Sequence, residues 1–365
     1  MRLIHCADLH IDSNLRTYLT EEEANARKNE ILNNFPRLIQ YATQNNINKI
    51  LIAGDLFDAD SVSRHAENVV YNAILGNPRI MFYYVPGNHD ENNFLVGNRD
   101  LPKNIVVFDE KLRKIPLNDA GTIVLYSLKL TEENYKSFYD YLNFDESKFN
   151  ILMLHGEERS GGSANFEECI DFGKLKNKGI DYLALGHIHK RITMPLDERG
   201  MIVYPGCLEG RGFDECGEHG FYVADINEEI LNVAYTFVPF AHRRMIELDV
   251  PVTGVTGTTD IAERIQNSLD KNEIDPDDFL KIVLCGKTDV FADKNLDYLL
   301  VCFKETAKVV KIVDKTSPYV DYDSYKNDMS LKGEYIRLVQ NADLSDTDKA
   351  CIIKMGIDAL MGEKS

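Results

Sequence analysis

The chain is constrained most by the stretch Val85-Pro86-Gly87-Asn88-His89-Asp90. It follows residues 79–84, an apolar and aromatic run typical of a buried strand, and Pro86-Gly87 then turns the chain into an amide, an imidazole and a carboxylate. Loops at strand ends are where α/β proteins place their chemistry. Because four other apolar runs also end in Asp or His, we expect five strand ends to meet at one site.

The polar residues at these strand ends are of the types that bind metal ions. They comprise two carboxylates, one amide and four imidazoles: Asp8, His10, Asp55, Asn88, His155, His187 and His189. Carboxylate and neutral imidazole ligands suit manganese, iron or zinc. Seven ligands are too many for one tetrahedral ion, and they suit two divalent ions that share a bridging carboxylate. Such a pair clamps a phosphate, so we predict that His89 acts on the phosphate and protonates the leaving alkoxide.

The order of the expected elements predicts a parallel sheet. Strands at 2–7, 49–53 and 79–84 alternate with helices at 20–45 and 64–75, and Thr20 with Glu23 has the form of a capping box. This alternation favours right-handed crossovers between parallel strands. We expect a polar helix at 132–143 and further strands at 104–108, 122–126, 150–154, 181–185, 202–204 and 220–225.

The pattern changes after about Arg243, where strands no longer end in Asp or His clusters. Strands at 245–250 and 279–285 with helices at 261–269 and 295–303 indicate a small α+β domain. The tail has apolar-periodic segments at 335–339 and 346–360. One face of its last helix carries an apolar stripe that either packs within the chain or meets a partner: Ala350, Ile353, Ile357 and Leu360.

Composition limits the classes of function. A formal net charge of −18 argues against a protein that coats nucleic acid by bulk electrostatics, but it permits an enzyme whose local field is set by bound cations. Basic residues near the expected site are few, and we expect them to be solvated surface charges more than DNA contacts: Arg16, Arg64, Arg99, Lys190, Arg191 and Arg211. The seven cysteines are scattered and form no C-x-x-C pair, which indicates reduced thiols.

No apolar run approaches the roughly 20 residues of a membrane helix. The N-terminal strand lacks the organisation of a signal peptide. We therefore expect a cytoplasmic protein without membrane contact.

The strand-end motifs resemble those of the calcineurin-like metallophosphoesterase superfamily over residues 1 to about 225. The resemblance implies an α/β fold, a four-layer β-sandwich flanked by helices. It implies His89 as the catalytic histidine. It also implies two ion sites that share Asp55, one formed by Asp8, His10, Asp55 and His189 and the other by Asp55, Asn88, His155 and His187.

Nearly the whole chain is similar to SbcD-like exonucleases of the SbcC–SbcD family. The motifs are Leu3 to His10, Gly54-Asp55-Leu56-Phe57-Asp58, Tyr204-Pro205-Gly206 with Glu209-Gly210-Arg211, Ser330 to Tyr335, and a final helix that ends at 359–363. This similarity implies that Asp58 is the hydrogen-bond partner of His89. It also implies a nuclease domain at 1–242, a small α+β capping domain at 243–328 and a helical C-terminal tail at 329–365. Asp90 is expected to orient a ligand histidine, because carboxylates outside the ligand set commonly do so.

The leading hypothesis is a manganese-dependent DNA nuclease that uses two divalent ions. The resemblance implies the nuclease subunit of a DNA repair complex, with DNA, an SbcC-like SMC-family coiled-coil ATPase and a second copy of the chain as partners. In one alternative, the same dimetal site hydrolyses a small-molecule or protein phosphoester. In the other, the chain is a non-catalytic assembly subunit.

Overall fold

The computed structural model describes residues 1–15, 19–58, 62–90, 95, 101–158 and 169–361. Contacts divide the chain into two units, Met1–Arg244 and Met245–Ser365. The boundary between the expected capping domain and tail, and the role of each, remain predictions. Arg16, Arg99 and the last residues of the C-terminal motif, 362 and 363, lie outside the described residues. Within the described part of the chain, no helix is both long and apolar enough to cross a membrane.

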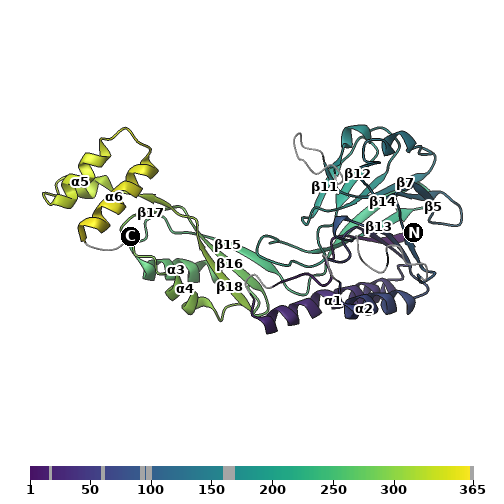
Figure 1. Ribbon diagram of the computed structural model, residues 1–365, viewed down its shortest axis with the longest axis horizontal. Helices are drawn as coiled ribbons and strands as arrows, with labels where there is room; N and C mark the ends of the chain where they lie inside the picture. The colour runs from purple at the N-terminus through teal and green to yellow at the C-terminus, as the bar shows by residue number, and fades with distance from the viewer. Residues whose placement is uncertain (16–18, 59–61, 91–94, 96–100, 159–168, 362–365) are drawn as a thin grey trace. The chain divides into compact units, whose positions relative to one another are not determined.

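The first unit contains two six-stranded sheets (Figure 1). In the first sheet, β1, β2, β3 and β4 run parallel, which confirms the predicted alternation of strands and helices. β13 and β14 extend this sheet in the antiparallel direction. The order is β14-β13-β1-β2-β3-β4, with β1 at Arg2–Cys6, β2 at Lys49–Ala53, β3 at Met81–Val85, β4 at Ile105–Val107, β13 at Gly220–Asn227 and β14 at Asn232–Pro239.

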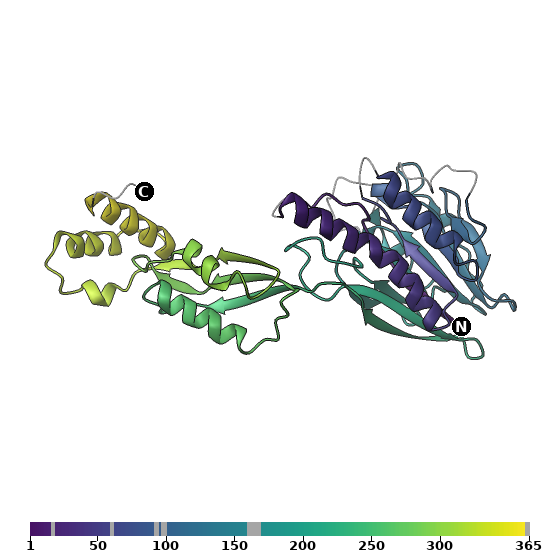
Figure 2. The same cartoon turned by 90° about the horizontal axis from the view of Figure 1, so that it is seen from below.

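Two helices, α1 (Glu21–Gln44) and α2 (Arg64–Leu75), lie side by side on one face of this sheet (Figure 2). α1 begins with the predicted capping box: Thr20 Oγ1 accepts a hydrogen bond from the Glu23 N–H, and the Glu23 carboxylate accepts one from the Thr20 N–H. Phe35 of α1 and Val70 of α2 are fully buried against the sheet. The apolar periodicity of the sequence therefore fixes which helix faces cover the strands.

The second sheet faces the first across a buried apolar layer, to which Leu3 and Leu51 contribute from one side and Ile151 and Ala184 from the other. β6, β7, β10 and β12 are parallel, while β5 and β11 are antiparallel edge strands. This arrangement confirms the expected sandwich. The order is β11-β12-β10-β7-β6-β5, with β5 at Arg113–Pro116, β6 at Ile123–Ser127, β7 at Phe149–His155, β10 at Tyr182–Gly186, β11 at Ile192–Pro195 and β12 at Met201–Tyr204.

The polar helix expected at 132–143 is wrong. The segment forms turns and a short 3-10 helix, η2 (Phe138–Tyr141). Asn134 explains the difference, because its side chain accepts from the Thr131 N–H and donates to the Lys129 carbonyl, which offers the backbone an alternative to helix. Short elements complete this side of the unit: β8 (Glu157–Glu158), β9 (Cys169–Ile170) and η3 (Phe172–Lys174).

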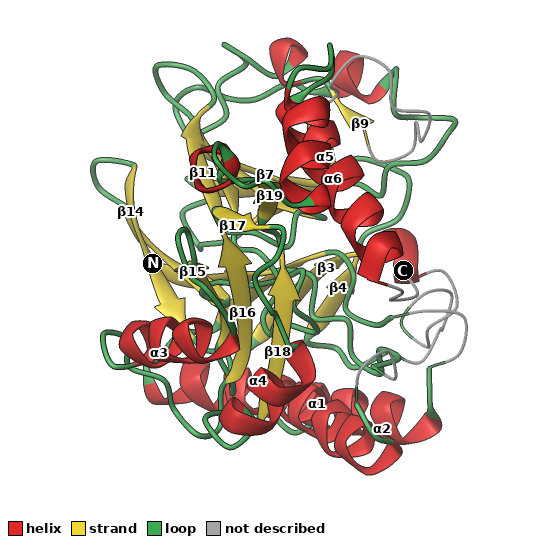
Figure 3. Cartoon of the chain, turned by 90° about the vertical axis from the view of Figure 1, so that its left-hand side faces the viewer, coloured by secondary structure: helices red, strands yellow, loops and turns green. Residues whose placement is uncertain are grey.

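The second unit is built on a parallel three-stranded sheet with its own buried core (Figure 3). The expected helices and strands of this region are confirmed. The order is β15-β16-β18, with β15 at Met245–Pro251, β16 at Phe279–Cys285 and β18 at Val309–Asp314, and the helices are α3 (Thr258–Leu269) and α4 (Leu296–Phe303).

The C-terminal segment forms a second small core. Ala350, Ile353 and Ile357 of the apolar stripe are buried there with Ile336 and Val339, so these positions pack within the chain. Leu360, also in the stripe, is 53% exposed. The elements are β17 (Lys287–Asp289), β19 (Ser317–Tyr319), η4 (Tyr322–Tyr325), α5 (Leu331–Gln340) and α6 (Asp346–Met361).

Candidate metal centre

The parallel strands carry the seven expected ligands to a common point. Asp8 and His10 follow β1, Asp55 follows β2, and Asn88 begins the 3-10 helix η1 (Asn88–Asp90) after β3. From the second sheet, His155 ends β7, and His187 and His189 follow β10. His155 Nδ1 lies 3.0 Å from the carbonyl oxygen of Ala53, the last residue of β2, which joins the two sheets at the site.

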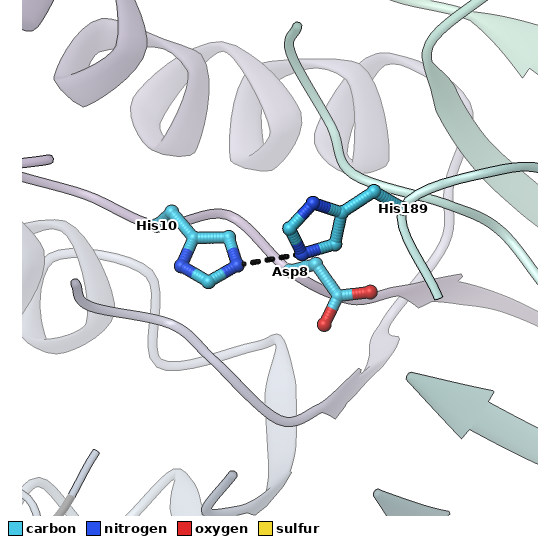
Figure 4. Close-up of side chains that lie close together, drawn as sticks. All are labelled: Asp8, His10 and His189. Carbon is cyan, nitrogen blue, oxygen red and sulfur yellow. Dashed lines mark hydrogen bonds between the residues drawn. The ribbon is translucent and has the colours of Figure 1, made fainter. Parts of the chain in front are cut away.

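Asp8, His10 and His189 form one group of potential ligands, with their ligand atoms within 4.8 Å of one another. The rings of His10 and His189 point toward each other beside the Asp8 carboxylate (Figure 4), and their Nε2 atoms are 3.0 Å apart. Two imidazoles that aim the same nitrogen at one place, next to a buried carboxylate, are arranged as ligands of a shared cation.

Asp8, Asp55 and His155 form an adjoining group. Asp55 Oδ2 lies 3.4 Å from His155 Nε2 and 3.7 Å from His10 Nε2, so this carboxylate reaches both groups. Asn88 Oδ1 is 3.1 Å from His155 Nε2. His187 completes the set with its ring 5.3 Å from that of His155. All seven residues come together, and their division between two ions remains a prediction.

The backbone at the site is held in an unusual conformation. Asp8, His10, Asp55 and His187 have φ values of 51°, 44°, 48° and 98°, in a region that non-glycine residues seldom adopt. Strain of this kind concentrates at functional sites. Position 54 has no room for a side chain, because a Cβ there would lie 1.9 Å from His155 Nδ1.

The shifted pKa values of the buried residues at the site favour the binding of a cation. Burial, together with the charge of Asp55, raises the pKa of Asp8 to about 6. Burial alone would lower the pKa of His155, but the carboxylates of Asp55 and Asp8 raise it to about 10, so that a protonated His155 balances them in the metal-free protein. Burial lowers the pKa of His10 and His187 to about 4, which keeps them neutral, the state in which imidazole binds metal. The donor set therefore fits divalent cations.

His89 lies beside the ligand set with its side chain 43% exposed. Its Nδ1 is 3.1 Å from Asp58 Oδ1, the contact expected between these residues. Asp58 also accepts hydrogen bonds from Ser13 Oγ and from Arg211 Nη1, the latter at 3.2 Å. Burial opposes ionisation of Asp58, but His10, Ser13 and the charge of Arg211 outweigh it and hold its pKa below the usual range.

Asp90 is fully buried and binds backbone N–H groups and the side chain of Tyr84. Its carboxylate accepts from the N–H groups of Leu56, Phe57 and Gly87 at 3.2, 3.0 and 3.0 Å. It therefore links the loop after β2, which carries Asp55, to the loop after β3, which carries Asn88. That Asp90 orients a ligand histidine stays a prediction.

The sequence did not predict the contacts of two further residues at the site, although Arg211 was among the basic residues expected near it. Arg211, expected at the surface, is largely buried and pairs with Asp58 and Glu215. Glu215 Oε1 lies 2.7 Å from His189 Nδ1. The four-residue spacing of Arg211 and Glu215 after the Pro205-Gly206 turn was a visible signal, but only the fold shows that the loop returns to the site.

The sequence pattern of the calcineurin-like phosphoesterase family matches residues 1–191, more than half of the chain. The chain belongs to this family. The matched region contains every expected ligand and His89, while Arg211 and Glu215 follow it. The protein is accordingly a phosphoesterase.

Similar members of the family differ in how much of the chain they cover. The uncharacterized metallophosphoesterase YhaO of Bacillus subtilis is 28% identical over 284 residues, 74% of this chain and 68% of YhaO. The DNA double-strand break repair protein Mre11 of Sulfurisphaera tokodaii is 23% identical over 383 residues, 96% of this chain and 92% of that protein. A subunit of the nuclease SbcCD of Rhodobacter capsulatus is 32% identical over 94 residues, 25% of this chain and 22% of its own.

Proposed function

We propose that this phosphoesterase is a metal-dependent DNA nuclease that serves in DNA repair. The observation that carries the proposal is the alignment with the Mre11 protein of Sulfurisphaera tokodaii, because it extends over 96% of the chain and so includes the second unit. A phosphoesterase site alone does not distinguish DNA from a small phosphoester. Similarity in the part of the chain that lacks the site favours DNA.

The seven clustered residues Asp8, His10, Asp55, Asn88, His155, His187 and His189 would hold two divalent ions, manganese in this proposal. Two such ions supply positive charge that binds and polarises a phosphodiester. Asp8 and Asp55 are buried beside His10 and His187, whose lowered pKa keeps them neutral. Buried carboxylates beside neutral imidazoles favour the binding of divalent cations.

His89 is proposed as the catalytic acid. Its Nδ1 faces Asp58, so Nε2 is left to face a substrate at the exposed side of the ring. A protonated His89 can donate from Nε2 to the leaving alkoxide oxygen. Asp58 fixes the ring through Nδ1–H and stabilises the imidazolium by its charge.

The second unit is proposed to bind an SMC-family coiled-coil ATPase, and the complex is proposed to contain two copies of this chain. Helices α5 and α6 expose Leu331, Leu338 and Met355 by 69, 70 and 64%, although each helix also has a buried apolar side. Exposed apolar side chains on two helices that pack together support the proposal that a partner covers them. An ATPase would also supply Lys and Arg side chains that contact the DNA phosphates. This chain has a formal net charge of −18, which does not favour binding to DNA by itself.

The test is nuclease activity on linear double-stranded DNA with manganese, with magnesium and with a chelator, each with and without an SMC-family ATPase and ATP. We expect cleavage with manganese and a rate lower by about 10²–10⁴-fold in the His89→Ala variant. Cleavage of bis(4-nitrophenyl) phosphate but of no DNA under any condition would instead favour the small-molecule or protein phosphoesterase. DNA processing that is unchanged by His89→Ala would favour an assembly role.

A further inference from the structure

Arg211 lies between two carboxylates of the site, Asp58 and Glu215. Its Nη1 donates to Asp58 Oδ2 at 3.2 Å, while Nη2 and Nε donate to Glu215 Oε1 at 2.8 and 3.2 Å. Each of these carboxylates holds a histidine of the site: Asp58 Oδ1 is 3.1 Å from His89 Nδ1, and Glu215 Oε1 is 2.7 Å from His189 Nδ1. One guanidinium group thus connects the proposed acid to a proposed metal ligand.

The segment that carries Arg211 is fixed on both sides. The Arg211 N–H donates to Glu215 Oε2 at 2.7 Å, which closes the loop between these residues. Two residues earlier, the buried Glu209 carboxylate accepts from Asn34 Nδ2 of α1 at 2.7 Å and from the guanidinium of Arg27 at 2.5 Å. A long side chain held at both its backbone and its charged end can set the orientation of its partners.

We propose that Arg211 and Glu215 are positioning residues that hold His89 and His189 in their working orientations, an inference that rests on the proposed role of His89. Glu215 accepts the Nδ1–H of His189, which selects the tautomer whose Nε2 lone pair faces His10 and the ion site. Arg211 Nη1 and Ser13 Oγ both donate to Oδ2 of Asp58, so Oδ1 is the oxygen presented to His89. The guanidinium is permanently charged and planar, which allows it to serve two carboxylates at once.

The two arms of the network predict two different losses. Arg211→Gln leaves Ser13 Oγ as the remaining described donor to Asp58 Oδ2 and so weakens the hold of Asp58 on His89. The defect therefore falls on protonation of the leaving group. The phenoxide that leaves diphenyl phosphate needs a proton. We expect the kcat for this ester to fall by about 10–100-fold, which is typical when a residue that orients a functional side chain is lost. The kcat for bis(4-nitrophenyl) phosphate, with its better leaving group, should fall several-fold less. Glu215→Gln acts on His189, so the affinity for manganese in a calorimetric titration should fall by about 10-fold.

The control is Arg2→Gln, which makes the same charge change at the start of β1, where Arg2 pairs with Asp225. It should change neither readout. Thermal melting identifies a variant that fails to fold. In that case Arg211→Lys is measured in the same way, because its point charge cannot replace the planar fork and the same selective loss is expected.

The inference is overturned if Arg211→Gln or Arg211→Lys lowers both kcat values equally or leaves both unchanged, or if Glu215→Gln binds manganese as the wild type does. His89→Ala, measured with the same two esters, separates this failure from that of the proposed function. If His89→Ala shows the strong dependence on the leaving group and the Arg211 variant does not, only the positioning role is wrong. If His89→Ala shows no such dependence, the proposed acid itself is wrong.

Discussion

The loops that form the candidate metal centre and the helices α5 and α6 differ in which side chains they bury and which they expose. At the centre, polar groups are buried and meet at short distances, as Asp55 and His155 do at 3.4 Å. On α5 and α6, apolar groups such as Leu338 and Met355 are exposed. Burying charge is unfavourable unless it is balanced, and a large contiguous exposed apolar patch commonly marks an interaction site. The first region carries the residues proposed for chemistry, and the second carries those proposed for association.

The strongest test of the chemical region is His89→Ala. General acids contribute about 10²–10⁴-fold to rate, so kcat for diphenyl phosphate should fall within that range. The melting temperature should stay nearly unchanged, because the ring is 43% exposed and contributes little packing. His65→Ala, which removes an exposed histidine of α2, is the control and should retain full activity. A large loss of stability in His89→Ala would mean that the residue supports the fold and not the reaction.

Gly54→Ala tests whether the close packing of the centre is essential. A Cβ at Gly54 would lie 1.9 Å from His155 Nδ1, and its φ of +89° already disfavours a side chain. We expect a loss of about 2–4 kcal/mol in the free energy of unfolding, from overpacking and backbone strain together. Urea unfolding measures it, and calorimetry should show weakened manganese binding.

Gly121→Ala separates these two causes. Gly121 also has a positive φ, +66°, but a Cβ there meets no atom within 4 Å. The loss should be about 1 kcal/mol, from backbone strain alone, and metal binding should be unaffected. Equal losses at Gly54 and Gly121 would show that contact with His155 has no energetic consequence.

His5 shows what burial does to a histidine outside the centre. It is fully buried in β1, with Nδ1 3.0 Å from Tyr182 Oη, and burial lowers its pKa from 6.5 to about 3. Below pH 6.5 the unfolded chain therefore binds a proton that the folded chain does not, and the free energy of unfolding falls as the pH falls. Between pH 7 and pH 5 this residue should cost about 2 kcal/mol.

Urea unfolding of the chelator-treated protein at the two pH values measures this effect against His5→Asn. The variant should lose about 2 kcal/mol less than the wild type over the same pH interval. Because each protein is compared with itself at two pH values, the lost contact with Tyr182 cancels. The same pH dependence in both proteins would exclude His5 as its source.

The clustering of the seven strand-end residues could be predicted because its signals are local. A strand followed at once by Asp8, Asp55 or His155 indicates both the fold and the chemistry, since parallel strand ends meet at one edge. The contacts of Arg211, and Glu215 itself, were not predicted because the loop that carries them folds back to Asp58 and His189, and such a loop leaves no periodic pattern in the sequence. The polar helix predicted at 132–143 does not form. The side chain of Asn134 hydrogen-bonds to the backbone of Thr131 and Lys129, and these local bonds replace those of a helix.

The smallest expected effect on stability comes from helices α5 and α6, the proposed partner surface. Leu338→Ser on α5 removes an exposed side chain, so the free energy of unfolding should change by less than about 0.5 kcal/mol. Ile353→Ala on α6 removes a fully buried side chain and should cost about 2–5 kcal/mol. If α5 and α6 bind the ATPase, Leu338→Ser should weaken the complex in a pull-down while leaving hydrolysis of bis(4-nitrophenyl) phosphate intact. Unchanged association would move the partner surface away from Leu338, whereas lost hydrolysis would show that the exposed helices contribute to the reaction itself.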